Sequence, residues 1–359
     1  MKDKRRTSGS ARLPTIRDVA ARAAVSPATV SNVLSGLRGV TEDRRRAVLE
    51  AVEALGYKSN HMASSLRRGE TRTVGIVVPD LGNEFFAGLV HEWEMIASNG
   101  GYEILVVASG ENPATEARRI ASLIARRIDG LLVVAAEDDF GALPGFPAGL
   151  PPTVLVDRAF GHSQFDTVAS DHFDAGYRGC RHLINLGHRE ISFLITSTAH
   201  KHLRDRIDGY RKALADAGLA ARERVVLGGA SVEGCRSAIE QDLRRSDRPT
   251  AVFAGTFNAT LGAVKAISAL DLAFPKGISL LGFEHSEWMT ALRPYISTVR
   301  QSAGELAARS WQTLLTRIGN DAADLAHVKI QFETVFREST RPPPHVPDRR
   351  EAEALSAPA

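Results

Sequence analysis

The sequence predicts a small all-α head followed by a larger α/β body with parallel, doubly wound sheets. Two patterns indicate this division. Short amphipathic helices with capping residues fill the N-terminal part, and beyond them strands with almost no charge alternate with amphipathic helices. The length of 359 residues, with 43% hydrophobic and 24% charged residues, suits two or three domains and excludes a chain that is disordered overall.

The head is predicted to contain three helices. Thr15 is the expected N-cap of a helix over 16–23. Ser26 is the expected N-cap of a second helix over 27–34, which has proline at its first position. A third helix is expected over 41–55, before a glycine. Two short helices joined by a tight turn are typical of a helix-turn-helix.

The body is predicted to form two parallel sheets with helices on their faces. Its apolar runs have the length of buried strands, and the segments between them have helical periodicity. Strands are expected at 73–79, 102–108, 130–135, 153–157, 190–196, 224–228, 250–254 and 278–282, and helices at 84–99, 114–127, 172–186, 204–217, 232–244, 259–270 and 302–318.

Positive charge is concentrated in the head. Residues 1–72 contain 15 Lys and Arg but 7 Asp and Glu, a net charge of +8, whereas the rest of the chain carries a net charge of −5. A basic head on an acidic body indicates a polyanion as the partner of the head. Charge alone leaves open the alternative of a solvated basic tail.

The second head helix offers small and polar side chains that suit DNA. Its N-terminus and hydroxyls fit phosphate contacts, Asn32 can pair with an adenine edge, and Ala28 or Thr29 can touch a thymine methyl group. A three-helix bundle without a nucleic-acid role has the same spacing and remains an alternative. The outward-facing residues are expected to be Pro27, Ala28, Thr29, Ser31 and Asn32.

Residues 15–35 and 40–57 resemble the headpiece of the LacI/GalR family of bacterial transcription repressors, and the resemblance continues to about residue 338. It implies a helix-turn-helix headpiece joined by a hinge helix to a two-lobed, periplasmic-binding-protein-like (type I) α/β domain. It also implies a homodimer that binds a pseudo-palindromic operator under the control of a small polar effector. The expected domains are a disordered basic tail at 1–13, the headpiece at 14–58, the hinge at 59–72, the effector-binding and dimerisation domain at 73–340, and a disordered tail at 341–359.

By the same resemblance the body has two lobes that the chain enters more than once. The first lobe is expected at about 73–160 plus 298–325, and the second at 161–292 plus 328–338. The chain would then cross between the lobes three times. Such crossings allow a ligand in the cleft to change the angle between the lobes.

The resemblance assigns the contacts with DNA to the head and the hinge. In this family the hinge folds in the minor groove and a leucine wedges between base pairs, which bends the duplex. Leu66 is the matching leucine, and the alternative is that it packs on the body. Ser59 stands where the family often has proline. The residues expected to contact DNA are Thr15, Ser26, Pro27, Ala28, Thr29, Ser31, Asn32, Asn60, Ala63 and Leu66.

The resemblance also places an effector site at the carboxyl ends of the strands, where open sheets bind ligands. Arg206 matches the effector arginine of the family, and Glu284 stands where the family usually has aspartate. The phenylalanines could instead belong to the core, and Arg206 to a helix surface. The expected effector residues are Asn83, Phe85, Phe86, Asp157, Arg158, Arg206, Thr256 and Glu284.

Departures from the family pattern affect the second lobe's side of this site. Thr256 and Phe257 replace a common Asn-Asp pair, Gly229 is not followed by an aromatic residue, and His285 replaces a second acid. A sugar, a sugar acid or another small polar metabolite is therefore expected. Two arginines at the site lean mildly towards a negatively charged group.

The sequence lacks the motifs of the common enzyme and cofactor classes. It has no dinucleotide or P-loop glycine pattern, no GxSxG and no HExxH, so we expect no enzyme, cofactor or metal site. His200 and His202 are expected to be surface histidines.

We expect a cytoplasmic, nucleoid-associated protein. Two cysteines form no disulfide framework, the N-terminus has no apolar signal region, and no apolar run suits a membrane span. The main alternative is a solute-binding protein without a DNA role, and the second is an enzyme on an α/β fold. Mutation of Asn32 and Arg22 without loss of operator binding would favour the first.

Overall fold

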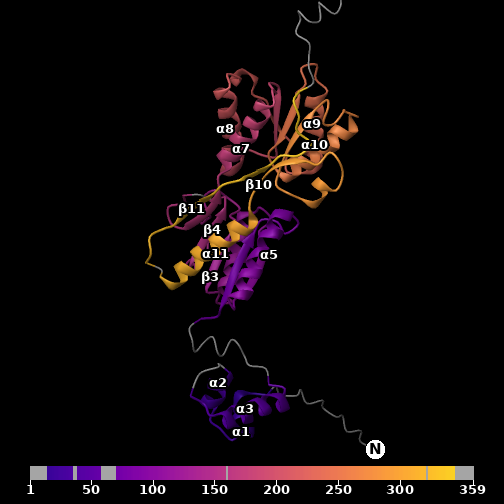
Figure 1. Cartoon of the computed structure of the whole chain (residues 1–359). Helices are drawn as coiled ribbons and strands as arrows, with labels where there is room; N and C mark the ends of the chain where they lie inside the picture. Colours follow the sequence, from indigo (N-terminus) through magenta and orange to yellow (C-terminus); the bar gives the residue numbers. More distant parts are fainter. Residues whose placement is uncertain (1–13, 35–38, 58–69, 159–160, 321, 344–359) are drawn as a thin grey trace, which may run out of the picture. The chain divides into compact units, whose positions relative to one another are not determined.

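The computed structural model describes residues 14–34, 39–57, 70–158, 161–320 and 322–343 (Figure 1). The chain separates into two compact units, Met1–Thr71 and Arg72–Ala359. The expected N-terminal tail, most of the hinge and the residues from 344 onward lie outside the described residues.

The head unit contains three helices: α1 (Ile16–Arg22), α2 (Pro27–Leu34) and α3 (Glu42–Leu55). Small apolar residues meet at their crossing, so the helices approach closely. Helix α3 ends at Gly56, whose φ of 59° lies in the left-handed region that glycine tolerates. The buried core consists of Val19, Ala20, Val30, Val33, Val48 and Ala51.

The first sheet of the body has the strand order β11-β5-β4-β3-β1-β2 and all its pairings are parallel. Trp93 and Trp311 pack on one face of it, and Ile120 and Leu123 on the other. This lobe comprises β1 (Thr73–Val78), α5 (Glu84–Asn99), β2 (Glu103–Ala108), α6 (Pro113–Ile124), β3 (Gly130–Val133), β4 (Thr153–Asp157), β5 (Asp166–Ser170), α11 (Ala303–Gly319) and β11 (His327–Ile330).

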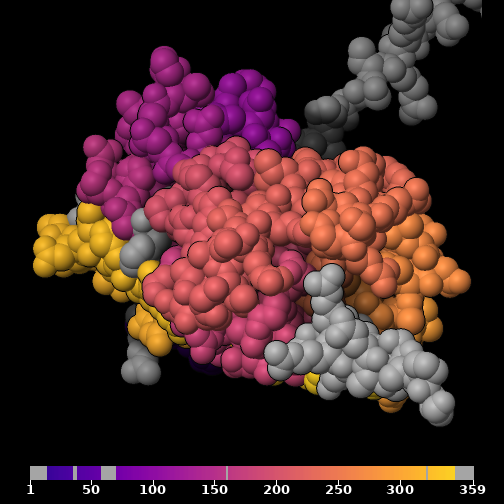
Figure 2. Space-filling model, turned by 90° about the horizontal axis from the view of Figure 1, so that it is seen from above, coloured from indigo at the N-terminus to yellow at the C-terminus, as the bar shows by residue number. Residues whose placement is uncertain are grey.

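The second sheet has the order β12-β10-β9-β8-β6-β7 and is parallel apart from β12, which runs antiparallel to β10. Helices α7 and α8 cover one face, and α9 and α10 the other. The part coloured from pink to orange forms a continuous surface in the centre of Figure 2. This lobe comprises α7 (His172–Asn185), β6 (Ile191–Ile195), α8 (Lys201–Asp216), the 3-10 helix η1 (Ala220–Arg222), β7 (Val225–Leu227), α9 (Val232–Leu243), β8 (Ala251–Ala254), α10 (Phe257–Ala269), β9 (Ser279–Phe283), the 3-10 helix η2 (Glu287–Thr290), β10 (Ser297–Arg300) and β12 (Glu333–Val335).

The chain passes between the two sheets at three places, and two of the expected lobe boundaries are wrong. Strand β5 belongs to the first sheet, so the first crossing follows Ser170 and not residue 160. The terminal segment expected at 328–338 in the second lobe is divided, because β11 pairs with β5 in the first sheet and only β12 reaches the second. Strand β10 pairs with β9, so the second crossing begins after Arg300.

The C-terminal segment is ordered further than expected. Arg341, predicted to lie in a disordered tail, accepts a hydrogen bond at its carbonyl from Nε2 of the fully buried His188 at 2.8 Å. The Arg341 N–H donates to the Ser279 hydroxyl at 3.0 Å. These contacts hold residues up to about 343 on the second lobe.

The two cysteines, Cys180 and Cys235, are buried and free, and burial raises the pKa of both thiols. No helix among the described residues combines the length and apolar character that a membrane crossing requires.

Candidate functional sites

The first candidate site is the outer face of helix α2 in the head. The Ser26 hydroxyl accepts a hydrogen bond from the Thr29 N–H at 3.1 Å and shares another with the Thr29 hydroxyl at 2.9 Å, which caps the helix as expected. Pro27, Ala28 and Asn32 are exposed, and Thr29 and Ser31 are half-buried, while the valines of the same helix are buried. One face of α2 therefore builds the core and the other is free for a partner.

Thr15 has a local structural task in addition to its predicted DNA contact. Its hydroxyl accepts from the Asp18 N–H at 3.4 Å, and its own N–H donates to the Asp18 carboxylate at 2.7 Å. This capping box fixes the start of α1. The remaining predicted DNA contacts, Asn60, Ala63 and Leu66, lie outside the described residues.

The second candidate site lies at the carboxyl ends of strands from both lobes, beside the three crossings. Asp157 is the last residue of β4 in the first lobe, and Glu284 follows β9 in the second. Their φ angles are 74° and 67°, values that a residue other than glycine rarely adopts. Both side chains are buried, so each carboxyl group is held between the lobes away from solvent. Such strained positions concentrate at functional sites.

The helix that carries Arg206 is held against α7 by two glycines. A Cβ atom on Gly176 would lie 2.0 Å from the Arg206 carbonyl oxygen, and one on Gly209 would lie 2.0 Å from the Phe173 carbonyl oxygen. Helices α7 and α8 therefore cross with their backbones in contact. This close crossing brings Arg206 to the first residue of α7, His172.

Arg206 is buried and its guanidinium is engaged on several sides. It donates to the Gly255 carbonyl at 2.7 Å and, through Nε and Nη2, to Nδ1 of His172 at 3.3 and 3.2 Å. Its guanidinium carbon lies 3.8 Å from the centre of the Phe283 ring. Arginine can only donate, so Nδ1 of His172 must be the acceptor and Nε2 must carry the proton. Nε2 then donates to the Asp157 carbonyl at 3.1 Å.

Arg158 belongs to the first lobe and is already paired. Its two terminal nitrogens donate to both carboxylate oxygens of Glu111 at 2.7 and 2.8 Å. The guanidinium also lies 5.5 Å from the centre of the Phe86 ring, whose other side packs in the core of the first lobe. Phe86 thus serves both the core and the site. Arg158 and Arg206, the two arginines that favoured a negatively charged effector, therefore already have hydrogen-bond partners within the protein.

Each of the three crossings supplies a buried side chain that was not among the predicted effector residues. His172 opens α7 after the first crossing, and Gln301 lies in the second, where its amide donates to Glu284 at 3.0 Å. Phe332 lies in the third, with its ring 5.4 Å from that of His172. Residues of the crossings between the lobes therefore contact the predicted effector residues Arg206 and Glu284.

We call the side chains gathered here the lobe junction: Asp157, Arg158, His172, His202, Arg206, Glu284 and Gln301. His202 was expected at the surface, and that expectation is wrong. It is 6% exposed, with its ring 5.3 Å from that of His172. Its position in α8, one turn before Arg206, carries it inward.

Burial dominates the protonation behaviour of the lobe junction. It raises the pKa of Glu284 to about 7 and raises that of Asp157, although Arg206 opposes both changes. Burial and the neighbouring arginine charges hold the pKa of His172 and His202 well below the usual value. Burial lowers the pKa of Arg206 to about 10, so it stays charged near neutral pH while both histidines are neutral.

Several polar atoms of the lobe junction lack a hydrogen-bond partner among the described residues. They are Asp157 Oδ1, Arg158 Nε, His202 Nδ1 and Gln301 Oε1. Buried polar atoms are normally satisfied, and exceptions require an explanation such as a ligand or bound water. Four of the seven such atoms among the described residues belong to the lobe junction, which suits a site that bound water or a ligand completes.

The other predicted effector residues lie at strand ends near helix starts. Asn83 caps α5 by accepting from the Phe85 N–H at 3.0 Å, and Thr256 caps α10 by accepting from the Ala259 N–H at 3.2 Å. Phe85 is partly buried against the core of the first lobe. These three residues have structural contacts, and their role towards an effector stays a prediction.

Comparisons with known proteins cover both units. Residues 15–60 match the family described as bacterial regulatory proteins, lacI family, and residues 71–343 match periplasmic binding proteins and sugar binding domain of LacI family. The chain is 32% identical over 343 residues to the HTH-type transcriptional repressor PurR of Photorhabdus laumondii subsp. laumondii, covering 94% of this chain and 100% of the relative. It is 30% identical over 333 residues to catabolite control protein A of Priestia megaterium, covering 91% and 99%.

Among solved structures, the chain is similar to the lac repressor dimer bound to operator and the anti-inducer ONPF. The TM-score is 0.80 at 23% identity, and the likeness covers 92% of this chain and 100% of the other. At this identity the likeness shows a shared fold.

Proposed function

Because this chain belongs to the LacI family of bacterial regulatory proteins, we propose that it is a transcriptional repressor whose hold on DNA is set by a small effector. The head binds a pseudo-palindromic operator as part of a homodimer, since two equivalent heads match two half-sites. The effector binds at the lobe junction. The protein acts on chromosomal DNA in the cytoplasm and has no catalytic role.

The observation that carries this proposal is the set of unsatisfied buried atoms at the lobe junction. Water or a ligand must satisfy them, and they lie where the two lobes and all three crossings meet. A molecule bound there contacts both lobes, so its binding energy depends on their angle. An effector can shift an equilibrium only through such a difference in affinity between two states.

The free atoms favour an effector that donates hydrogen bonds. Asp157 Oδ1 and Gln301 Oε1 are acceptors, and Arg158 Nε is the one free donor that arginine supplies there. The terminal nitrogens of Arg158 are paired with Glu111, and Arg206 is engaged by His172 and Gly255. Hydroxyl groups satisfy such acceptors without bringing a charge into a buried place. A neutral sugar or similar polyol fits better than a sugar acid, which revises the mild preference for an anion.

The DNA-binding part is tested by changing Asn32. Asn32→Ala removes an exposed side chain that can pair with an adenine edge, a contact worth about 1–3 kcal/mol. We expect at least about a fivefold loss of affinity for a selected genomic operator, with little change in affinity for random competitor DNA or in melting temperature. Fluorescence anisotropy at one fixed salt concentration measures both affinities.

Glu53→Gln, on the exposed face of α3, is the matched control and is expected to leave the specificity ratio intact. Equal losses on operator and random DNA for Asn32→Ala would contradict base recognition by α2. Absence of any preferred genomic fragment for the unchanged protein would favour the solute-binding alternative.

The effector part is tested by a thermal-shift screen that pairs neutral sugars with their sugar acids. A ligand that binds only the folded state raises the melting temperature by mass action. We expect stabilisation by a neutral member of a pair to exceed that by its acid. Stabilisation by acids alone would overturn the donor-rich chemistry while leaving the repressor assignment intact.

A further inference from the structure

Helix α8 begins without a capping side chain of its own. His200 occupies the N-cap position and its side chain makes no capping hydrogen bond. The first turn of any helix has N–H groups that lack partners within the helix, and they need an external acceptor. In α8 that acceptor is Asp138, whose two carboxylate oxygens lie 2.9 and 2.8 Å from the backbone nitrogen of Lys201.

Asp138 belongs to the other lobe. It follows β3 of the first lobe, whereas α8 packs in the core of the second. Arg204, one turn into α8, also donates to Asp138 at 2.7 Å. The other long helices of the body have capping bonds from their own N-cap side chains, namely Asn83, Asn112, Asp171, Ser231, Thr256 and Ser302.

The helix that receives this cap carries two members of the lobe junction. Arg206 and His202 both lie on α8, within two turns of its start. Burial and the charge of Arg158 lower the pKa of His200 at the N-cap, while Glu111 and Asp138 oppose this change. The cap therefore lies near the Arg158–Glu111 pair. The contact from Asp138 to Lys201 is therefore a bond between the lobes beside the candidate effector site.

We propose that Asp138 is a positioning residue of the effector site that caps α8 from the other lobe. The cap joins the Arg206 helix to the first lobe, and opening of the lobes removes the acceptor from the first turn of α8. Lobe closure is therefore favoured in the absence of any ligand. Its relevance to effector control rests on the function proposed above, but the cap itself does not.

The expected strength of the cap suits a contact between the lobes that forms and breaks reversibly. Loss of an N-cap acceptor changes the equilibrium between the folded and the frayed first turn of a helix by about fivefold. The ion pair with Arg204 adds little, because both side chains are partly exposed. An effect of this size shifts the equilibrium between open and closed lobes but leaves both states populated.

The experiment uses the full chain without DNA or effector and compares three variants. Asp138→Ala removes the cap, Asp138→Asn keeps an acceptor for the Lys201 N–H, and Asp139→Ala removes the neighbouring, exposed carboxylate. Hydrogen exchange followed by mass spectrometry reports the amides at the start of α8. A distance measurement between spin labels reports the lobe angle.

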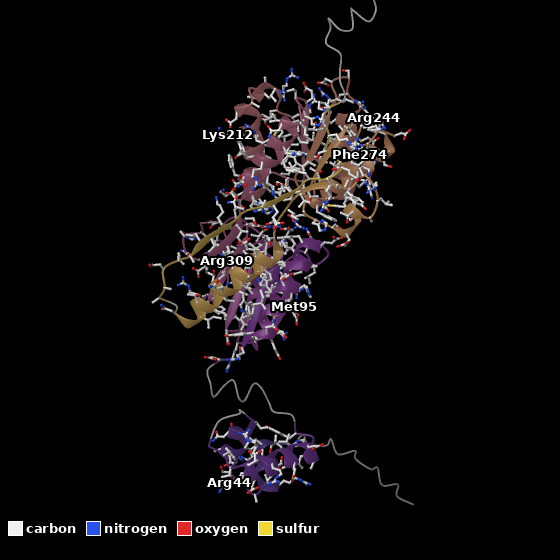
Figure 3. The ribbon with its side chains drawn as sticks, in the orientation of Figure 1. Arg44, Met95, Lys212, Arg244, Phe274 and Arg309 are labelled. Carbon is white, nitrogen blue, oxygen red and sulfur yellow. The ribbon has the colours of Figure 1, made fainter. Side chains whose placement is uncertain are left out.

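Labels are placed at Arg309→Cys on α11 and Lys212→Cys on α8, both labelled in Figure 3. The native cysteines are buried and their thiol pKa is raised, so the introduced ones react selectively. Doubly labelled chains are diluted with unlabelled protein so that distances within one chain dominate.

We expect Asp138→Ala to speed exchange of the first α8 amides about fivefold and to populate a longer distance between the labels. Asp138→Asn is expected to restore protection, and Asp139→Ala to match the unchanged protein. Overlap of Asp138→Ala with the unchanged protein in both measurements, or an equal effect of Asp139→Ala, would overturn the cap. Neither result bears on operator binding, so the two proposals fail separately.

Discussion

The two candidate sites of this chain are built in opposite ways. The outer face of α2 takes its residues from one short run, and most of them are exposed above a core of small apolar side chains. The lobe junction draws on strand ends, helix starts and crossings that are far apart in the sequence, and its charged groups are buried. An exposed site can change without affecting stability, whereas a buried charged site cannot.

The largest expected effect comes from removing the central cation of the lobe junction. Arg206→Met leaves Asp157 and Glu284 without their shared positive neighbour and leaves the Gly255 carbonyl without its donor. Breaking a buried charge network from one side destabilises by about 3–5 kcal/mol. We expect the melting temperature of the body to fall by several degrees and ligand stabilisation to disappear.

Arg211→Met on the same helix is the matched control, because the Arg211 side chain is half exposed and its ion pairs lie at the surface. We expect a change of less than about 1 kcal/mol there. Calorimetry measures the melting temperatures of both variants. Equal melting temperatures would contradict the distinction between the buried and the exposed site.

An intermediate effect is expected at Glu116, a buried acid beside the lobe junction. Its carboxylate accepts the Ala136 N–H at 2.7 Å, and burial raises its pKa from 4.5 to about 7. The unfolded chain loses this proton at lower pH than the folded chain. The stability contributed by Glu116 therefore falls as pH rises from about 4.5 to about 7 and stays low above that.

Glu116→Gln keeps an acceptor and removes the charge. We expect little difference from the unchanged protein at pH 4.5 and a gain of about 3 kcal/mol in the free energy of unfolding at pH 8. Urea unfolding at several pH values measures it, with the exposed Glu94→Gln as control. A gain that does not grow with pH would show that Glu116 is not a strained acid.

The smallest effect is expected in the head. Thr15→Ala removes the capping box with Asp18 and costs about 1 kcal/mol of helix stability. We expect faster hydrogen exchange in the first turn of α1 and an unchanged melting transition of the body. Thr15→Ser keeps the hydroxyl and serves as control. A loss of DNA affinity without a change in hydrogen exchange would instead assign Thr15 to the DNA contact alone.

The head was the easier part to predict because its information is local. Capping residues such as Thr15 and Ser26 act on N–H groups three residues away, so residue type and spacing are sufficient. The same holds for the strands and helices of the body that have strong apolar patterns. Strand β5 was missed because it starts with Asp166 and contains Thr167, polar residues that are buried here, Asp166 in an ion pair with Arg317.

The lobe junction was predicted only in part, since it depends on how two sheets face each other. Asp157, Arg206 and Glu284 were found because they follow strands or match a known pattern. His172 and Gln301 stand at helix starts whose positions were predicted, but nothing local shows that both crossings turn them inward. Asp138 lies in a run of three acids that has the pattern of an exposed turn.

The repeated crossings affect how the protein is made. The head helices are complete once Tyr57 has been synthesised, but the first lobe lacks α11 and its edge strand β11 until Ile330 emerges from the ribosome. The second lobe also waits for the segment around Arg341 that binds His188. During translation a finished head therefore precedes a body in which each lobe still lacks its last elements.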